Sequence, residues 1–94
     1  MSNLHCYINK QFLPIEKAGV SVTDLLVQRG YGIFDYLRVA DNKPLFLEDH
    51  LERFYNSANM MRLQVKETKE EVLKIVHELI KMNHLDYSGI RLII

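Results

Sequence analysis

The chain has 94 residues, of which 48% are hydrophobic and 26% charged, and its formal net charge is zero. This composition excludes a disordered tail, and a net charge of zero gives no field that would favour nucleic acid or an anionic membrane. No apolar run approaches the roughly 18 residues of a membrane helix, and the N-terminus lacks the regions of a signal peptide. The single Cys6 cannot form an internal disulfide, which fits a reducing cytoplasm.

The first third of the chain predicts a hairpin followed by a short helical turn. Residues 4–14 hold two short apolar runs on either side of Asn9 and Lys10, and asparagine tolerates the positive φ of a tight turn. Thr23 and Asp24 are of the residue types that cap helices at their N-terminus. We therefore expect a short helical turn directly after them.

The next segment predicts a strand and its return. Residues 33–39 are β-branched and aromatic, which is typical of a strand, and we expect Phe34 and Tyr36 to face opposite sides of it. Turn-forming residues occupy positions 41–43. A short returning strand is expected to begin with residues 44–46.

From about Glu48 the hydrophobic period becomes helical. At 100° per residue a core stripe is formed by Leu51, Phe54, Ala58 and Met61. Along one edge of this stripe lie His50, Arg53 and Ser57. A cation so close to an apolar stripe has either a surface partner, such as Glu48 or Glu52, or a ligand. We expect a structural role for His50.

A second helix and a final strand complete the chain. Thr68 and Glu71 have the spacing of a capping box, in which each side chain accepts a hydrogen bond from the other residue's backbone N–H. The inner face of this helix is predicted to hold Val72, Ile75, Val76, Leu79, Ile80 and Asn83. Residues 88–94 are strand-like and apolar. Because they end without a turn or a polar tail, we expect the chain to be truncated within this strand.

Several motifs then occur in a familiar order. They are RGYGIFDYLR at 29–38, PLF at 44–46 and HLERF at 50–54, followed by Ser57 and Ala58. In this order and spacing the chain resembles the N-terminal small domain of the class IV (fold type IV) pyridoxal-phosphate enzymes. That family includes branched-chain aminotransferases, D-amino acid aminotransferases and aminodeoxychorismate lyases. Other matching positions are the early hairpin, Asp24, Leu63 and the Ile90-Arg91 strand, so the resemblance covers nearly the whole chain.

The resemblance implies an α+β fold, with a mostly antiparallel sheet and two helices packed on one face. Residues 1–94 would form the small N-terminal domain of a two-domain enzyme, truncated near its C-terminal strand. The larger domain, which carries the Schiff-base lysine of the family, would lie beyond Ile94. The family members further imply a homodimer with its sites near the subunit interface.

The resemblance also assigns site residues. Arg53 maps onto the arginine that contacts the cofactor phosphate, and a planar guanidinium suits a phosphate dianion because it donates two charge-assisted hydrogen bonds. Four residues map onto positions that border the substrate, namely Phe34, Asp35, Arg38 and Arg91. At position 35 the family commonly has glutamate, one methylene longer. Arg91 is the candidate for the α-carboxylate of the substrate.

The lysines and histidines of the chain suggest no further catalytic group. A lysine that forms an imine must be partly neutral, so it needs burial or a cationic neighbour. The lysines all belong to turns, loops or polar helix faces, and none meets this requirement. The four histidines show no metal-ligand spacing with Cys6. We therefore expect no catalytic residue and no metal site within the 94 residues.

The leading hypothesis is that the full-length protein is a pyridoxal-phosphate-dependent class IV aminotransferase. It would transfer an amino group between an amino acid and a 2-oxo acid, and the 94-residue segment would be inactive alone. One alternative is an aminodeoxychorismate lyase-like enzyme on the same scaffold. The other is a non-enzymatic interaction module, in which the apolar segment 92–94 would offer an edge to a partner strand.

Overall fold

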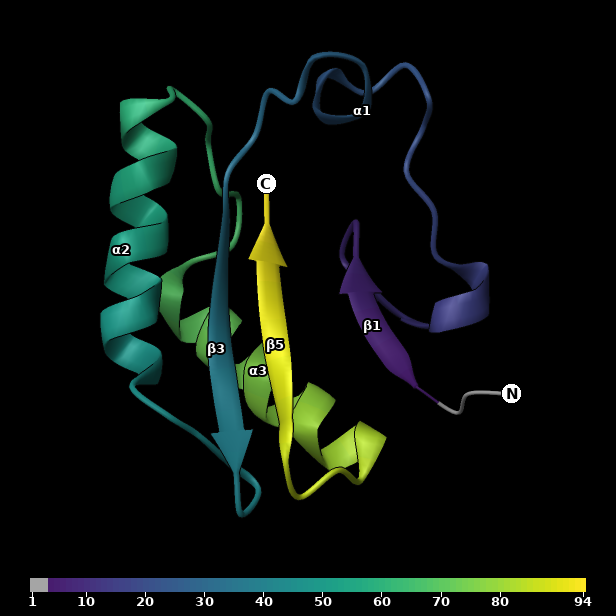
Figure 1. Cartoon of the computed structure of the whole chain (residues 1–94), viewed down its shortest axis with the longest axis vertical. Helices are drawn as coiled ribbons and strands as arrows, with labels where there is room; N and C mark the ends of the chain where they lie inside the picture. The colour runs from purple at the N-terminus through teal and green to yellow at the C-terminus, as the bar shows by residue number, and fades with distance from the viewer. Residues whose placement is uncertain (1–3) are drawn as a thin grey trace.

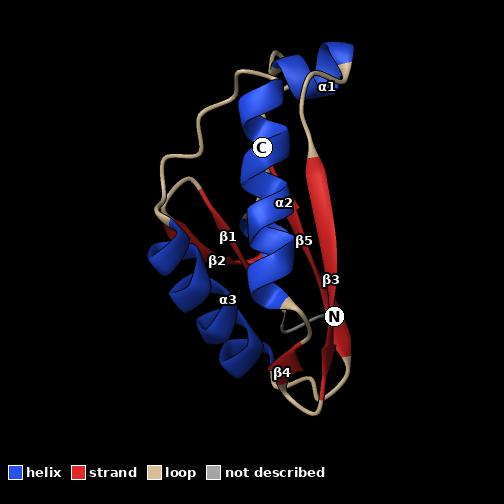
Figure 2. Cartoon of the chain, turned by 90° about the vertical axis from the view of Figure 1, so that its left-hand side faces the viewer, coloured by secondary structure: helices blue, strands red, loops and turns tan. Residues whose placement is uncertain are grey.

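The computed structural model of the chain describes residues 4–94, which form a layer of antiparallel strands and a layer of helices (Figures 1 and 2). In chain order the elements are β1 (His5–Ile8), β2 (Gln11–Pro14), the 3₁₀ turn η1 (Ile15–Lys17), α1 (Leu25–Arg29), β3 (Phe34–Ala40), β4 (Lys43–Pro44), α2 (Leu47–Met60), α3 (Lys69–Asn83) and β5 (Ser88–Ile93). One sheet has the order β4-β3-β5, and β1 pairs with β2 in a second sheet. The predicted α+β class is confirmed.

The hairpin of β1 and β2 forms as predicted. Asn9 and Lys10 have φ values of 50° and 70°, the left-handed conformation that both residues of a tight two-residue hairpin turn adopt. The amide of Asn83, at the end of α3, accepts from the backbone nitrogen of His5 at 2.6 Å and donates to its carbonyl at 3.1 Å. This pair of bonds fixes the hairpin to α3.

The expected short helix is α1. The side chain of Asp24 accepts a hydrogen bond from the backbone nitrogen of Leu26 at 2.9 Å, which is the N-cap contact that the sequence predicts. Gly30 ends the helix with a φ of 63°, a left-handed conformation that glycine adopts without a Cβ penalty. A short loop over residues 31–33 then leads into β3.

The returning strand is shorter than predicted. β4 covers only Lys43–Pro44 and pairs with Val39 and Ala40, although the backbone nitrogen of Leu45 still donates to Arg38 at 2.8 Å. Phe46 does not continue the strand, because its φ of 55° turns the chain into α2. The edge of β3 that lies opposite to β5 is therefore unpaired from Phe34 to Leu37 in the described structure.

The core lies between the three-stranded sheet and the two long helices. Figure 2 shows α2 and α3 on the same side of β3 and β5. The buried cluster consists of Leu37, Val39, Leu47, Leu51, Val72, Val76 and Ile80. Phe54 and Ala58 of the predicted stripe are buried as well, whereas Met61 follows the helix and is half-buried. The capping box of Thr68 and Glu71 is present at the start of α3. Among the described residues, no helix is long and apolar enough to span a membrane.

Candidate functional site

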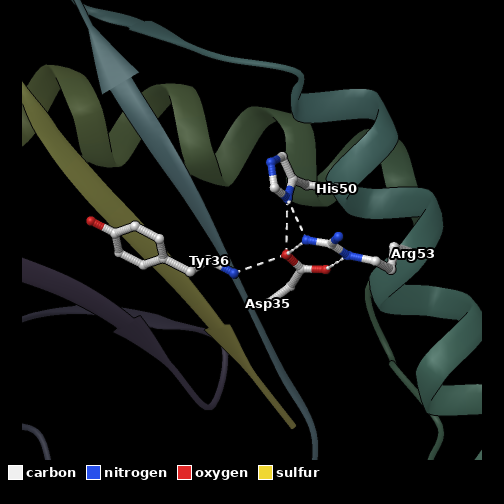
Figure 3. Close-up of polar contacts among 4 residues, drawn as sticks. All are labelled: Asp35, Tyr36, His50 and Arg53. Atoms are coloured by element: carbon white, nitrogen blue, oxygen red, sulfur yellow. Dashed lines mark hydrogen bonds and ion pairs between the residues drawn. The ribbon is translucent and has the colours of Figure 1, made fainter.

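The side chain of Asp35 accepts two hydrogen bonds from Arg53 in a bidentate ion pair. Arg53 Nε donates to Asp35 Oδ2 at 2.8 Å, and Arg53 Nη2 donates to Oδ1 at 2.7 Å (Figure 3). His50 Nδ1 lies 2.9 Å from Oδ1, and the backbone nitrogen of Tyr36 donates to the same oxygen at 2.9 Å. Asp35 is 5% exposed, so this carboxylate is buried with all its partners supplied by β3 and α2.

Local periodicity explains why these groups meet. Asp35 shares the helix-facing side of β3 with Leu37 and Val39, because side chains alternate along a strand. His50 and Arg53 are three residues apart in α2, which places them one turn apart on one side of the helix. The cation beside the apolar stripe therefore has a partner from the sheet, Asp35, rather than Glu48 or Glu52.

The pair stays charged over most of the pH range. The hydrogen bonds from Arg53 lower the pKa of Asp35 from 3.8 to about 2, although burial of the carboxyl acts in the opposite direction and His50 adds to the lowering. In return, the hydrogen bond to Asp35 raises the pKa of Arg53. The side chain of Arg53 is nevertheless 65% exposed. Its positive charge is thus held in place by a buried anion and presented to solvent.

The proton on His50 is assigned by distance. Its Nδ1 lies 2.9 Å from Asp35 Oδ1 and 3.2 Å from Arg53 Nη2, which is always a donor. The shorter contact favours a proton on Nδ1 that is donated to Asp35. His50 is then a second orienting group for the carboxylate, which agrees with the structural role expected for it.

The opposite side of β3 is open. Phe34 and Tyr36 are 66% and 45% exposed, and they lie on the same side of the strand together with Arg38. The expectation that Phe34 and Tyr36 face opposite sides was wrong, because positions two apart in a strand point the same way. Figure 3 shows Asp35 and Tyr36 leaving β3 in opposite directions. Tyr36 is therefore a site-facing residue that the sequence interpretation left out.

Arg91 of β5 joins this open face. It lies directly opposite Tyr36 in the antiparallel register, and its guanidinium carbon is 5.6 Å from the centroid of the Phe34 ring. The structure thus brings together three of the four predicted substrate residues, Phe34, Arg38 and Arg91. It does not bring Asp35 to them. Its side chain points toward α2 and contacts Arg53, because side chains alternate along β3. The role of Asp35 beside the substrate stays a prediction.

Two further features bear on the chemistry of the site. All seven lysines lie in the described part of the chain, and all are exposed. A cavity of about 850 Å³ is lined by residues of β1, α3 and β5, among others. Arg91 lines it, but Phe34, Arg38 and Arg53 do not. The candidate site is therefore a surface around the first half of β3 and not an enclosed pocket of the described residues. Those residues also hold no cluster of His, Cys, Asp or Glu suited to a metal ion.

Comparison with known proteins gives a consistent result. A D-alanine aminotransferase of Staphylococcus haemolyticus is 37% identical over 84 residues, which cover 89% of this chain and 30% of that protein. A putative branched-chain-amino-acid aminotransferase of Methanocaldococcus jannaschii is 34% identical over 88 residues, 94% of this chain and 31% of that protein. The solved branched-chain aminotransferase of the thermophilic archaeon Thermoproteus uzoniensis with norvaline superposes with a TM-score of 0.88 at 28% identity, over 96% of this chain and 32% of that one.

The chain thus spans about 30% of the length of the curated relatives that it matches. The sequence profile of the family described as Amino-transferase class IV matches residues 32–94, which include all of β3, α2, α3 and β5. Both the ion pair of Asp35 with Arg53 and the open face of the sheet lie within this match. The chain belongs to the class IV amino-transferase family.

Proposed function

We propose that residues 1–94 form the small domain of a longer pyridoxal-phosphate-dependent aminotransferase, which transfers an amino group between an amino acid and a 2-oxo acid. Family membership supports this proposal, and so does the greater length of the relatives, which leaves room for a larger lysine-bearing domain. The observation that carries it is the arginine of the H-x-x-R motif. Arg53 is exposed to solvent, yet it is held in one orientation by the buried Asp35.

The geometry of Arg53 fits a phosphate group. A guanidinium has five N–H groups, and Asp35 takes one from Nε and one from Nη2. Of the remaining three, one on Nη2 lies beside His50 Nδ1 at 3.2 Å, and the two on Nη1 have no partner among the described residues. The two on Nη1 can donate to a phosphate dianion, which suits a planar donor. Fixing the side chain in advance lowers the entropy that is lost when the anion binds. The residues present therefore fit the phosphate of the cofactor.

The unpaired edge of β3 gives such a ligand access to both faces of the strand. β4 pairs only with Val39 and Ala40, so the backbone edge beside Phe34 and Asp35 is open. At this edge Arg53 would hold the phosphate of the cofactor from the helix side, and the groups proposed to face the substrate lie on the other side of the strand. When bound, pyridoxal phosphate would supply the electron sink of the reaction.

The open face supplies binding groups for the substrate. Arg91 and Arg38 are exposed cations on neighbouring strands, and guanidinium groups bind carboxylates by paired hydrogen bonds. Phe34 would form an apolar wall beside them. The imine-forming lysine would come from the rest of the longer protein, since each lysine of this chain is exposed and none is buried enough to be held neutral.

The proposal is tested by cofactor binding to the full-length protein. Adding pyridoxal phosphate should produce a visible absorbance band, and Arg53→Ala should weaken the affinity by about tenfold or more, because a charged hydrogen bond contributes roughly 1.5–3 kcal/mol. Arg62→Ala is the matched control, since Arg62 is an exposed arginine just beyond α2. Equal affinities of the Arg53→Ala and Arg62→Ala variants would defeat the assignment of Arg53.

The reaction itself separates the alternatives. Amino transfer that requires a 2-oxo acid acceptor supports the aminotransferase, whereas elimination from an aminodeoxychorismate-like substrate without an acceptor would point to the lyase. The 94-residue chain alone should show no transamination. It should also show no imine to pyridoxal phosphate that borohydride traps at a defined lysine. Such an imine would mean that one of the exposed lysines has been misjudged.

A homodimer and a cytoplasmic location are also part of the proposal. The family resemblance motivates the homodimer, and the single Cys6 motivates the reducing compartment. Sedimentation of the full-length protein tests the first, and a monomer at micromolar concentration would exclude it.

A further inference from the structure

Tyr36 lies across Gly89 of the neighbouring strand. In the register of β3 and β5, Tyr36 is directly opposite Arg91, so Gly89 is its diagonal neighbour. Diagonal neighbours are within reach of aromatic side chains. A Cβ on residue 89 would overlap Oη and Cζ of Tyr36 and lie 2.6 Å from Cε1. The phenol ring therefore fills the space that a side chain of residue 89 would occupy.

The position of the ring shapes the open face of the sheet. Gly89 lies directly opposite Arg38, so the ring is placed between the two exposed cations, Arg38 and Arg91. Tyr36 is 45% exposed, so part of the ring is covered by the sheet and part forms the surface. Glycine within a strand leaves a hollow where another backbone or side chain approaches closely. Here that hollow is filled from the next strand.

We propose that Tyr36 is a specificity-determining residue, which limits the room for the substrate side chain between Arg38 and Arg91. This inference rests on the proposed function, in which that face meets the substrate. With the hollow filled, the surface between the arginines suits amino acids with short side chains. Without the ring, a space lined by Gly89 would accept a longer one. A single methylene in an enclosed apolar pocket changes discrimination by about 10–200-fold. Because the described face is an open surface, we expect the loss of a whole phenol ring to change discrimination by about tenfold, at the lower end of that range.

Gly89 has a defined part in this arrangement. A methyl group at position 89 forces the Tyr36 ring away from the sheet, toward the space proposed for the substrate. Gly89→Ala should therefore weaken substrate binding when Tyr36 is present. The same change should have little effect when position 36 is alanine, because no ring is left to displace. This non-additivity is the signature of a contacting pair.

The experiment uses the cofactor-loaded full-length protein and 2-methyl amino acids. These compounds lack the hydrogen on Cα, so their binding is read from the cofactor absorbance without turnover. The measured quantity is the ratio of dissociation constants for a long compound, 2-methylnorleucine, and a short one, 2-methylalanine. Tyr36→Ala should shift this ratio by about tenfold in favour of the long compound. Tyr36→Phe keeps the ring and should leave the ratio within twofold of the original.

Controls separate this inference from misfolding and from the proposed function. Tyr87→Ala removes an exposed tyrosine that lies outside β5 and should not change the ratio. If Tyr36→Ala fails to fold, Tyr36→Val takes its place, because valine has a high strand propensity and also removes the ring. It should shift the ratio in the same direction. If both Tyr36→Ala and Tyr36→Val bind the cofactor but leave the ratio unchanged, the role of Tyr36 is overturned and the proposed function is unaffected. If the original protein binds no pyridoxal phosphate, the proposed function and this inference both fall.

Discussion

The two faces of β3 differ in burial: one packs in the core and the other is exposed. On the helix side, Leu37 and Val39 are 1% and 2% exposed and pack against α2 and α3. On the other side, Phe34 and Tyr36 remain largely exposed within the described structure. The helix side stabilises the domain, and the open side is available for a ligand. Asp35 is the exception on the helix side, because it is buried like a core residue and yet binds the exposed Arg53 of the candidate site.

The largest effect should come from the helix side of the strand. Leu37→Ala removes a fully buried side chain and should lower the free energy of unfolding by about 2–5 kcal/mol. Phe34→Ala, three positions earlier on the open side, should lower it by less than about 1 kcal/mol. Urea denaturation of both variants measures the contrast. Similar losses would show that the open face is covered in the folded protein.

An intermediate effect is expected from Asp35 at low pH. The pKa of Asp35 is about 2 in the folded protein and 3.8 for the ordinary side chain, which stands for the unfolded chain. The contribution of Asp35 to the free energy of unfolding is therefore nearly complete above about pH 4. That contribution is lost as the pH falls toward 2. Solvent screens the exposed Arg53, and this reduces the contribution of Asp35 to roughly 1–2 kcal/mol.

Unfolding free energies of the original protein and of Asp35→Asn, measured from pH 5 to pH 2, test this expectation. The difference between the two unfolding free energies should shrink by roughly 1–2 kcal/mol between pH 5 and pH 2. Asp49→Asn, which changes an exposed carboxylate in the first turn of α2, is the control. A difference that stays constant with pH would mean that Asp35 is not held charged by Arg53.

The smallest effect on stability should come from Arg91. Arg91→Ala removes an exposed side chain whose contact with the Phe34 ring contributes only about 0.5 kcal/mol. Substrate binding to the full-length protein should nevertheless weaken by about tenfold or more, because one guanidinium contact to a carboxylate is lost. Denaturation and substrate titration of the same variant give the two numbers. A variant that loses stability but binds substrate normally would reverse the proposed division between the faces.

Much of the site follows from sequence periodicity. The alternation of Asp35, Leu37 and Val39 already places the aspartate on the apolar side of the strand, where an unpaired carboxylate is costly. That pattern, together with the edge position of Arg53, is the signal from which the ion pair could have been predicted. The family resemblance assigned Asp35 to the substrate instead, which stays a prediction. The same alternation would have placed Phe34 and Tyr36 together.

Other features had no signal in the sequence. The early end of the returning strand depends on the left-handed conformation of Phe46, which a β-favouring aromatic residue does not suggest. The contact of Tyr36 with Gly89 depends on the register of two strands that are separated by both long helices. Register between distant strands is set by the packing of the whole core, so no local pattern reveals it.

By itself, the sequence determined the elements of this protein: the hairpin turn at Asn9 and Lys10, the capping box of α3, the apolar stripe of α2 and the ordered motifs of the family. These depend on residues close together in the chain, whose preferences are local. Only the tertiary structure decided which partner each functional side chain meets. Arg53 gained its buried partner, and Tyr36 its place over Gly89, because packing brought β3 against α2 on one side and β5 on the other.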